Sequence, residues 1–316
     1  MKHIYVYSPS GAVRDKAAFR RGVAQLKSMG YGVEVDIDAL RSHQRFAGDD
    51  QTRLAAIHRA AASGADLALI SRGGYGYTRI LDAIDYKKVA RAINAGMLFV
   101  GMSDFTAFQC AVLAKTGAST WAGPALCEGF GPDTASAQGA GAGPDEIMSA
   151  CFQDLLELRS EGTGWRQLPA SAGVALEDVK VNNAQLWGGN LTMLTSLLGT
   201  PFFPQVRRGV LFLEDTAEHP YRIERMLTQL LHAGVLAQQK AVLLGQFTDY
   251  KLSAHDRGFR LSSVVHWLRQ KLKTPILTNL PYGHVPTKVL LPVGATVDLV
   301  AQQRDVLMVW GHVWAR

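Results

Sequence analysis

Short apolar runs alternate with amphipathic stretches through the first third of the chain. The runs predict buried β-strands at residues 4–7, 33–35, 67–70 and 98–100. Between and after them, apolar side chains recur at helical spacing, which predicts helices at 15–29, 49–62, 78–84, 86–95 and 106–115. Strands that alternate with helices in this way predict a parallel sheet with helices on both faces.

The second half of the chain has a different pattern. It predicts strands at 174–176, 184–187, 210–213, 242–247, 289–291, 296–300 and 306–310, and residues 276–280 lead to Pro281-Tyr-Gly-His284. Helices are predicted at 147–158, 191–198, 220–233 and 261–271. We therefore expect an α/β protein with a Rossmann-like domain at 1–160 and a smaller, β-rich α/β domain at 161–316.

Three segments carry turn or loop signals. Residues 131–144 are rich in Gly, Ala and Pro and predict a mobile loop. Residues 162–172 indicate an irregular crossing between the two domains, and residues 188–190, Gly-Gly-Asn, predict a turn.

Composition narrows the class of protein. With 47% apolar and 19% charged residues in 316, a folded core is expected. The net charge of +6 comes from scattered basic residues, so no nucleic-acid partner is expected. There is neither a signal peptide pattern nor an apolar run near the roughly 20 residues that span a bilayer, which favours a cytoplasmic protein without membrane contact. Three widely spaced cysteines predict neither a disulfide framework nor a zinc site.

Two loops follow predicted parallel strands, at the edge where such sheets bind ligands. In the first, Gly101-Met-Ser-Asp104, the chain turns from strand to helix and exposes Ser103 as a nucleophile elbow would. The usual Gly-x-Ser-x-Gly is not met, because Phe105 replaces the second glycine. The alternative is that Ser-Asp simply caps the helix.

The second loop, Ser71-Arg-Gly-Gly-Tyr-Gly76, resembles an anion-binding loop, since glycines let backbone N–H groups approach a ligand. It matches neither the dinucleotide fingerprint nor the P-loop. The alternative is a tight turn.

Two further residues could complete a catalytic set with Ser103. Glu214 ends an apolar strand, and His284 stands between Pro-Tyr-Gly and Val-Pro. A hydroxyl, an imidazole and a carboxylate are the groups that nucleophilic acyl transfer needs. The alternatives are a salt bridge or helix cap for Glu214 and an ordinary loop position for His284.

Taken in order, these motifs resemble the LD-carboxypeptidases, a family of serine peptidases that also includes the microcin C7 self-immunity peptidases. The matching stretches span nearly the whole chain: residues 46–53, 71–76, 101–104, 188–191, 213–216, 220–227 and 282–284. Tyr282 stands where Phe is common in the family, and residues 131–144 have no counterpart.

The resemblance implies roles for named residues. Ser103 matches the nucleophile, Glu214 the triad carboxylate and His284 the base. The N–H groups of Gly74 and Asp104 match the oxyanion-hole donors. Contacts with the substrate are implied for Arg72, Gly73, Trp187 and Asn190.

The same resemblance implies a cytoplasmic homodimer, without metal or cofactor, that releases the terminal D-alanine from murein tetrapeptides in peptidoglycan recycling. Two alternatives stay open. One is an immunity-type peptidase that cleaves a toxic aminoacyl-adenylate analogue, where Trp187 could stack on the base. The other is a non-catalytic α/β ligand-binding protein in which Ser103 is only a cap.

Overall fold

The computed structural model describes residues 1–133, 143–169 and 176–311. The chain forms two compact units, and each contains segments that are distant in sequence. The first unit comprises Met1–Arg159, Gly199–Pro204 and Pro286–Val293. The second comprises Ser160–Leu198, Gln205–Val285 and Gly294–Arg316. Two short segments from the second half of the sequence therefore belong to the first unit.

The first unit is built on a six-stranded sheet in the order β11-β5-β4-β3-β1-β2. Five strands run parallel, and β11 is antiparallel to β5. The strands are β1 (His3–Tyr7), β2 (Gly32–Val35), β3 (Leu67–Ile70), β4 (Leu98–Gly101), β5 (Thr120–Ala122) and β11 (Leu291–Val293). Because β3 and β4 are parallel neighbours, the loops after them meet at one edge of the sheet.

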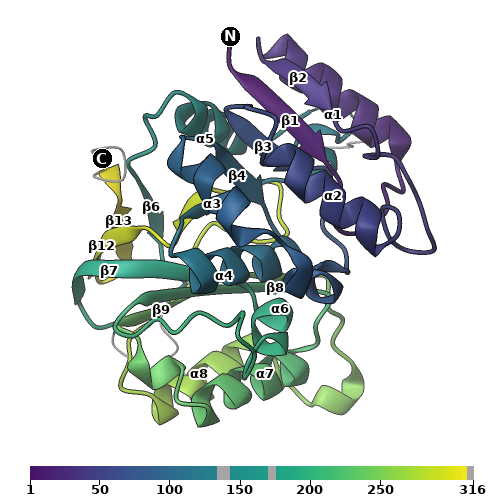
Figure 1. Cartoon of the computed structure of the whole chain (residues 1–316). Coiled ribbons are helices and arrows are strands. Elements are labelled where there is room, and N and C mark those ends of the chain that lie inside the picture. Colours follow the sequence, from purple (N-terminus) through teal and green to yellow (C-terminus); the bar gives the residue numbers. More distant parts are fainter. Residues whose placement is uncertain (134–142, 170–175, 312–316) are drawn as a thin grey trace. The chain divides into compact units, whose positions relative to one another are not determined.

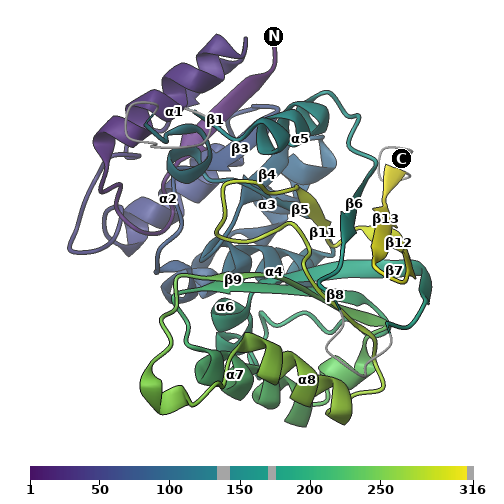
Figure 2. The same cartoon turned by 180° about the vertical axis from the view of Figure 1, so that it is seen from behind.

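Helices cover both faces of this sheet. Figures 1 and 2 show α2, α3 and α4 on one face and α1 and α5 on the other. Their bounds are α1 (Lys16–Ser28), α2 (Asp50–Ala60), α3 (Tyr86–Asn94), α4 (Phe105–Thr116) and α5 (Glu146–Leu156). Short helical turns lie at η1 (Tyr77–Arg79), η2 (Leu81–Ala83) and η3 (Leu126–Phe130). Helix α4 is apolar almost all round, and every residue from Phe105 to Leu113 is buried.

The second unit has a seven-stranded mixed sheet in the order β10-β9-β8-β7-β12-β13-β6. Strands β7 to β10 are parallel, whereas β7, β12, β13 and β6 pair antiparallel. The strands are β6 (Gly162–Arg166), β7 (Val179–Asn190), β8 (Val210–Thr216), β9 (Ala241–Thr248), β10 (Ile276–Leu277), β12 (Thr296–Gln302) and β13 (Asp305–Val309).

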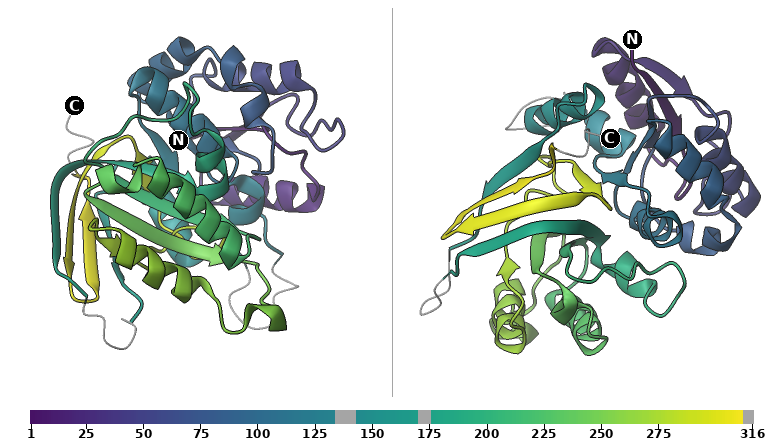
Figure 3. Two further views of the ribbon diagram at one scale, coloured as in Figure 1. Left: turned by 90° about the horizontal axis from the view of Figure 1, so that it is seen from below. Right: turned by 60° about the vertical axis from the view of Figure 1, so that its left-hand side comes forward.

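Helices α6 (Leu191–Ser196), α7 (Pro220–His232) and α8 (Leu261–Lys271) belong to this unit, with short turns at η4 (Leu236–Gln238) and η5 (Ala254–Asp256). Figure 3 shows α7 and α8 side by side on one face of the parallel strands. Helix α7 places Ile223, Leu227 and Leu230 inward, as its apolar spacing predicts.

Hydrogen bonds connect the two edges of the second sheet. The backbone N–H of Thr278, just after β10, donates to the side-chain oxygen of Gln167, just after β6, over 3.3 Å. The indole N–H of Trp165 donates to the carbonyl of Thr278 over 3.0 Å, and the N–H of Leu168 donates to the Thr278 hydroxyl. The sheet is therefore curled so that its edge strands approach each other, which protects edges that would otherwise be exposed.

The predicted fold class is confirmed, and β1 to β4 and α1 to α4 lie within two residues of the predicted ranges. The predicted helix at 78–84 is instead two 3₁₀ turns, and β5 was not predicted.

Two other predictions were wrong. Residues 162–166 form β6 rather than an irregular crossing, because they pair in full register with β13. Residues 188–190 form the end of β7 rather than a turn, because they pair with β8. A strand does form near the predicted 289–291, as β11 at Leu291–Val293, but it pairs with β5 and so belongs to the first unit.

Three predictions fall partly on residues 134–142 and 170–175, which lie outside the described residues: the loop at 131–144, the crossing at 162–172 and the strand at 174–176. Among the described residues, no helix combines the length and the apolar character needed to cross a bilayer.

We expect Gly188→Ala to destabilise the second unit strongly. Gly188 has φ +129°, and a Cβ atom added there would lie 2.0 Å from the carbonyl oxygen of Phe212 on β8. We expect a loss of unfolding free energy about 1–3 kcal/mol larger than that of Gly258→Ala, measured by urea denaturation. Gly258 is the matched control, since it also has positive φ but nothing lies within 4 Å of an added Cβ. Equal losses in the two variants would contradict this account.

Candidate active site

Ser103 occupies a sharp turn between β4 and α4 in the first unit. Its backbone has φ +63°, in the left-handed region that residues other than glycine seldom adopt. The first turn of α4 receives no side-chain cap, since the residue at its N-cap is Asp104 and its carboxylate makes no bond to the helix. Other non-glycine residues of this chain also have positive φ. At Ser103 that conformation coincides with a strand-to-helix turn, which is the backbone shape of a nucleophile elbow.

The Gly-rich loop after β3 packs directly against Ser103. A Cβ atom added at Gly73 would lie 2.8 Å from the Ser103 hydroxyl oxygen, so only glycine fits there. Gly74 has φ +124°, and an added Cβ would lie 3.1 Å from the Cα of Gly11. The loop is held to the turn after β1, because the N–H of Gly11 donates to the carbonyl of Gly73 over 3.2 Å.

Two backbone N–H groups near this turn have no acceptor within the described part of the chain. They belong to Gly74 and Asp104, the two residues for which an oxyanion-hole role was predicted. A backbone N–H without a protein partner can donate to a ligand.

The side chain of Asp104 joins three loops. It is fully buried, and its Oδ2 atom accepts two hydrogen bonds. One is a short bond from the Ser10 hydroxyl, and the second comes from the backbone N–H of Tyr77 over 3.1 Å. Its other oxygen has no partner among the described residues. Burial raises the pKa of the Asp104 carboxyl, although the bonds from Ser10 and Tyr77 oppose the rise.

Arg53 holds the loops that follow β1 and β3. Its side chain is fully buried and donates to the carbonyl of Gly76 over 2.8 Å and to that of Pro9 over 3.3 Å. It also pairs with Asp50, and its guanidinium lies 4.8 Å from the centroid of the Phe46 ring. Sequence reasoning assigned no role to Arg53 or Ser10, because neither side chain shows from spacing alone which loops it will reach.

Arg72 holds the Gly-rich loop in place. One guanidinium nitrogen donates to the carbonyl of Ala12 over 3.3 Å, and another lies 3.8 Å from the carboxylate of Glu128. These contacts support the loop, and they leave contact between Arg72 and a substrate as a prediction.

In the second unit, His284 and Glu214 form a close pair. The Nδ1–H of His284 donates to Oε2 of Glu214 over 2.7 Å. Glu214 is fully buried at the end of β8, whereas 22% of the His284 side chain is exposed. Gly283 makes the approach possible, since it has φ +147° and an added Cβ would lie 3.3 Å from the same carboxylate oxygen. The pair has the geometry in which a carboxylate orients an imidazole.

Asn190 fixes the carboxylates at the end of β8. Its amide donates to Oε1 of Glu214 over 3.2 Å and to Asp215 over 2.8 Å. Asp215 also accepts from the N–H and hydroxyl of Thr192. Burial raises the pKa of the Asp215 carboxyl, and the nearby Glu214 adds to the rise. Asp215 is therefore engaged at the start of α6, which leaves Glu214 as the partner of His284.

Trp187 lies in the core of the second unit. Its side chain is fully buried, and its indole N–H donates to the Gln239 side chain over 3.0 Å. This burial favours a core role over contact with a ligand.

The predicted site residues fall into two groups. Arg72, Gly73, Gly74, Ser103 and Asp104 belong to the first unit, and Trp187, Asn190, Glu214 and His284 belong to the second. Across residues 1–133, 143–169 and 176–311, no group of three His, Cys, Asp or Glu side chains could hold a metal ion.

Comparison with known proteins agrees with the class that this geometry defines. Models of the LD-carboxypeptidase N-terminal and C-terminal domains match residues 4–123 and 183–299. The crystal structure of muramoyltetrapeptide carboxypeptidase from Oxalobacter formigenes is similar, with a TM-score of 0.83 and 38% identity over 97% of this chain and 98% of that one. The chain belongs to the LD-carboxypeptidase family.

Two further relatives carry different names. A Bacillus subtilis protein named "Probable murein peptide carboxypeptidase" is 29% identical over 284 residues, which cover 90% of this chain and 84% of the relative. The microcin C7 self-immunity protein of Escherichia coli is 24% identical over 74% of this chain and 71% of its own length. A structure of the microcin C7 protein with aspartyl sulfamoyl adenosine has a TM-score of 0.80 at 20% identity, over 98% of this chain and 96% of that chain, which shows a shared fold.

We expect Asp104→Asn to change the pH dependence of stability. Because burial raises the pKa of Asp104 above its unfolded value, its carboxyl contributes less stability as the pH rises from the unfolded pKa through the folded pKa. An amide does not titrate, so the variant should gain stability relative to the native protein as the pH rises above the ordinary Asp pKa of about 4. Urea denaturation at several pH values measures this difference.

Asp15→Asn provides a control of opposite sign. Hydrogen bonds from the N–H groups of Ala18 and Ala17 lower the pKa of Asp15. Its contribution to stability is present above the unfolded pKa and is lost as the pH falls through the folded pKa. The stability of Asp15→Asn relative to the native protein should therefore fall as the pH rises. The same sign in both variants would show that Asp104 is not titrating as its burial requires.

Proposed function

We propose that this protein is a serine LD-carboxypeptidase that releases the terminal D-alanine from murein tetrapeptides. The observation that carries the proposal is the contact between His284 and the fully buried Glu214. A carboxylate bound to Nδ1 leaves proton exchange to the Nε2 atom of the imidazole, which is the arrangement a general base needs. Membership of the LD-carboxypeptidase family supports the class of reaction.

In the proposed reaction, the Ser103 hydroxyl oxygen attacks the carbonyl carbon of the scissile amide while His284 accepts the hydroxyl proton. Glu214 stabilises the imidazolium that forms. The tetrahedral intermediate collapses, the C–N bond breaks, and His284 returns the proton to the departing D-alanine nitrogen. Water, with its proton taken by His284, then attacks the acyl carbonyl carbon. The bond to the Ser103 oxygen breaks, His284 returns the proton to that oxygen, and the tripeptide leaves as the free acid. The proposal requires Ser103 and His284 to act together on one substrate.

The N–H groups of Gly74 and Asp104 would stabilise the negative oxygen of the intermediate. Support comes from their lack of acceptors within the described residues and from the close packing of Gly73 on Ser103. Because both donors are backbone groups held by packed loops, little reorganisation would be needed during the reaction. Loss of one such donor typically lowers the rate by about 10²–10³-fold.

The physiological setting follows from the family resemblance. We propose a cytoplasmic homodimer that acts in peptidoglycan recycling on small murein peptides. The names of the Oxalobacter formigenes and Bacillus subtilis relatives support the substrate class. In the alternative, in which the chain cleaves an aminoacyl-adenylate analogue, Trp187 could stack on the base, and the burial of Trp187 gives that role no support.

The direct test uses a murein tetrapeptide with a free terminal D-alanine and follows its loss by mass spectrometry. The native protein should release D-alanine and react covalently with a fluorophosphonate probe, whereas Ser103→Ala should do neither. A protein that binds the tetrapeptide without cleaving it, and does not react with the probe, would be a non-catalytic ligand-binding protein.

We expect Glu214→Gln to retain the fold and to lower kcat by several orders of magnitude. The guide is the roughly 10⁴-fold loss seen when the orienting carboxylate of a serine protease triad becomes an amide. Steady-state kinetics on the tetrapeptide measure the change. Asp215→Asn is the comparison, because Asp215 is engaged with Thr192 and Asn190. Near-normal turnover by Glu214→Gln would remove Glu214 from the catalytic set.

We expect amidation of the terminal D-alanine to lower kcat/KM by the equivalent of about 2–4 kcal/mol, the usual cost of losing a buried charge partner. Equal turnover of the acid and the amide would show that the enzyme is not a carboxypeptidase.

The Arg72→Ala variant tests whether Arg72 is the partner of the substrate carboxylate. If Arg72 binds the carboxylate, the difference in kcat/KM between the acid and the amide should be smaller in this variant than in the native protein. If Arg72 only supports the loop through Ala12 and Glu128, both substrates should slow equally.

A further inference from the structure

The second unit contains a pocket that the proposed reaction does not use. It has a volume of about 350 Å³, within the range of about 300–1,000 Å³ that small-molecule sites occupy. Its apolar surface comes from Leu244 and Phe247 on β9 and from Leu261 and Val265 on α8. Glu214 and His284 are not among the residues that line it. We call it the α8 pocket.

The charges around the α8 pocket are of one sign. Arg260 and Arg269 line it, and no aspartate or glutamate does so among the described residues. The remaining polar groups include the amides of Gln246 and Asn279, which bond to each other over 3.1 Å. An apolar surface bordered by cationic side chains complements a ligand with an apolar body and one negative group.

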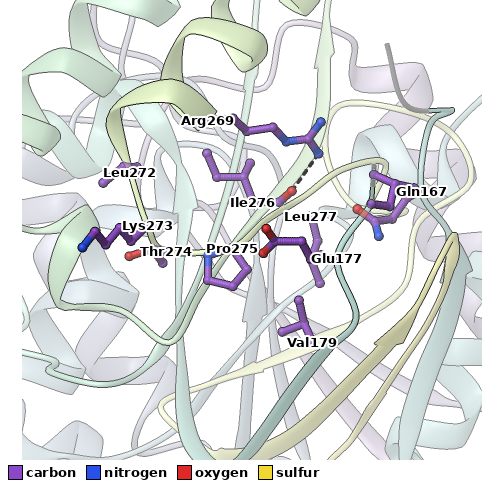
Figure 4. A pocket seen from close by; sticks show the side chains of 11 residues that line it. Gln167, Glu177, Val179, Arg269, Leu272, Lys273, Thr274, Pro275, Ile276 and Leu277 are labelled. Atoms are coloured by element: carbon purple, nitrogen blue, oxygen red, sulfur yellow. Dashed lines mark hydrogen bonds between the residues drawn. The ribbon is translucent and has the colours of Figure 1, made fainter. Parts of the chain in front are cut away.

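Arg269 is the most constrained of these cations. It is half-buried, and one guanidinium nitrogen donates to the carbonyl of Ile276 over 2.8 Å, as Figure 4 shows. It also lines the neighbouring pocket in Figure 4, where Glu177 lies, yet no carboxylate of the described residues comes within 4.0 Å of it. Burial lowers the pKa of Arg269 from its usual range. A half-buried guanidinium without a counter-charge is costly, and a bound anion would offset that cost.

We propose that the α8 pocket binds a monocarboxylate with an apolar chain. The carboxylate pairs with the guanidinium of Arg269, whose planar group matches it with two parallel hydrogen bonds. The chain lies against Leu244, Phe247 and Val265. This binding is independent of the proposed peptidase reaction, because it uses none of the residues assigned to that reaction.

The test is isothermal titration of the whole protein with decanoate, below its micellar concentration. Decyltrimethylammonium, which has the same chain and the opposite charge, is the matched probe and should bind at least about 10-fold more weakly. Arg269→Gln retains a donor for the Ile276 carbonyl but removes the charge, so it should weaken decanoate binding by about 10-fold or more. Arg225→Gln removes an equal charge from the exposed surface of α7, outside the pocket, and should leave binding unchanged.

A second variant blocks the site without touching Arg269. Val265 lies one helical turn before Arg269 on α8, and both side chains line the pocket. In Val265→Glu, the new carboxylate should pair with Arg269 at i, i+4 spacing and exclude decanoate. Because this pairing favours the helix, the melting temperature should not fall.

Three results would overturn the proposal. They are no decanoate binding by the native protein, equal binding of the anionic and cationic probes, and unchanged binding in folded Arg269→Gln or Val265→Glu. Activity on murein tetrapeptide is measured separately, so failure of this proposal leaves the peptidase proposal standing.

Discussion

One buried carboxylate organises the edge of the first sheet. Asp104 follows Ser103 in the chain, and its side chain receives hydrogen bonds from Ser10 after β1 and from Tyr77 after the Gly-rich loop. Burying a carboxyl group is costly unless hydrogen bonds replace water. The three loops must therefore lie where they can supply those bonds. The left-handed backbone at Ser103 persists because the surrounding loops over-determine it.

The same logic applies to glycine in this region. Gly73, Gly74 and Gly76 each lie against another part of the chain, namely Ser103, Gly11 and Arg53. A side chain at any of them would separate the loop from its neighbour. The Gly-rich loop is therefore fixed by packing against these neighbours, and its backbone N–H groups are held at the turn that carries Ser103. That arrangement fits stabilisation of a developing negative charge better than it fits a simple turn.

The second unit meets a comparable requirement with adjacent carboxylates. Glu214 and Asp215 follow each other on β8, and the amide of Asn190 donates to both. Asp215 takes its other bonds from Thr192 at the start of α6, whereas Glu214 bonds to His284. The two neighbouring acids thus share the amide of Asn190 and otherwise have separate partners. Loss of either set of partners would leave a buried carboxyl group without compensation.

The sequence by itself determined four of the six strands of the first sheet, β1 to β4, together with the α/β class and the family. Apolar periodicity reports directly which residues are buried, so β1 to β4 and α1 to α4 appear close to the predicted residues. Ser103, Glu214 and His284 could be predicted as a catalytic set because each follows a strand or a rigid turn. Only the tertiary structure placed β11 beside β5 and extended β7 through Gly188 to Asn190, since strand pairing joins residues far apart in sequence. It alone gave Asp104, Arg53 and Asn190 their roles and buried Trp187, because a side chain's partners depend on which loops the fold brings together.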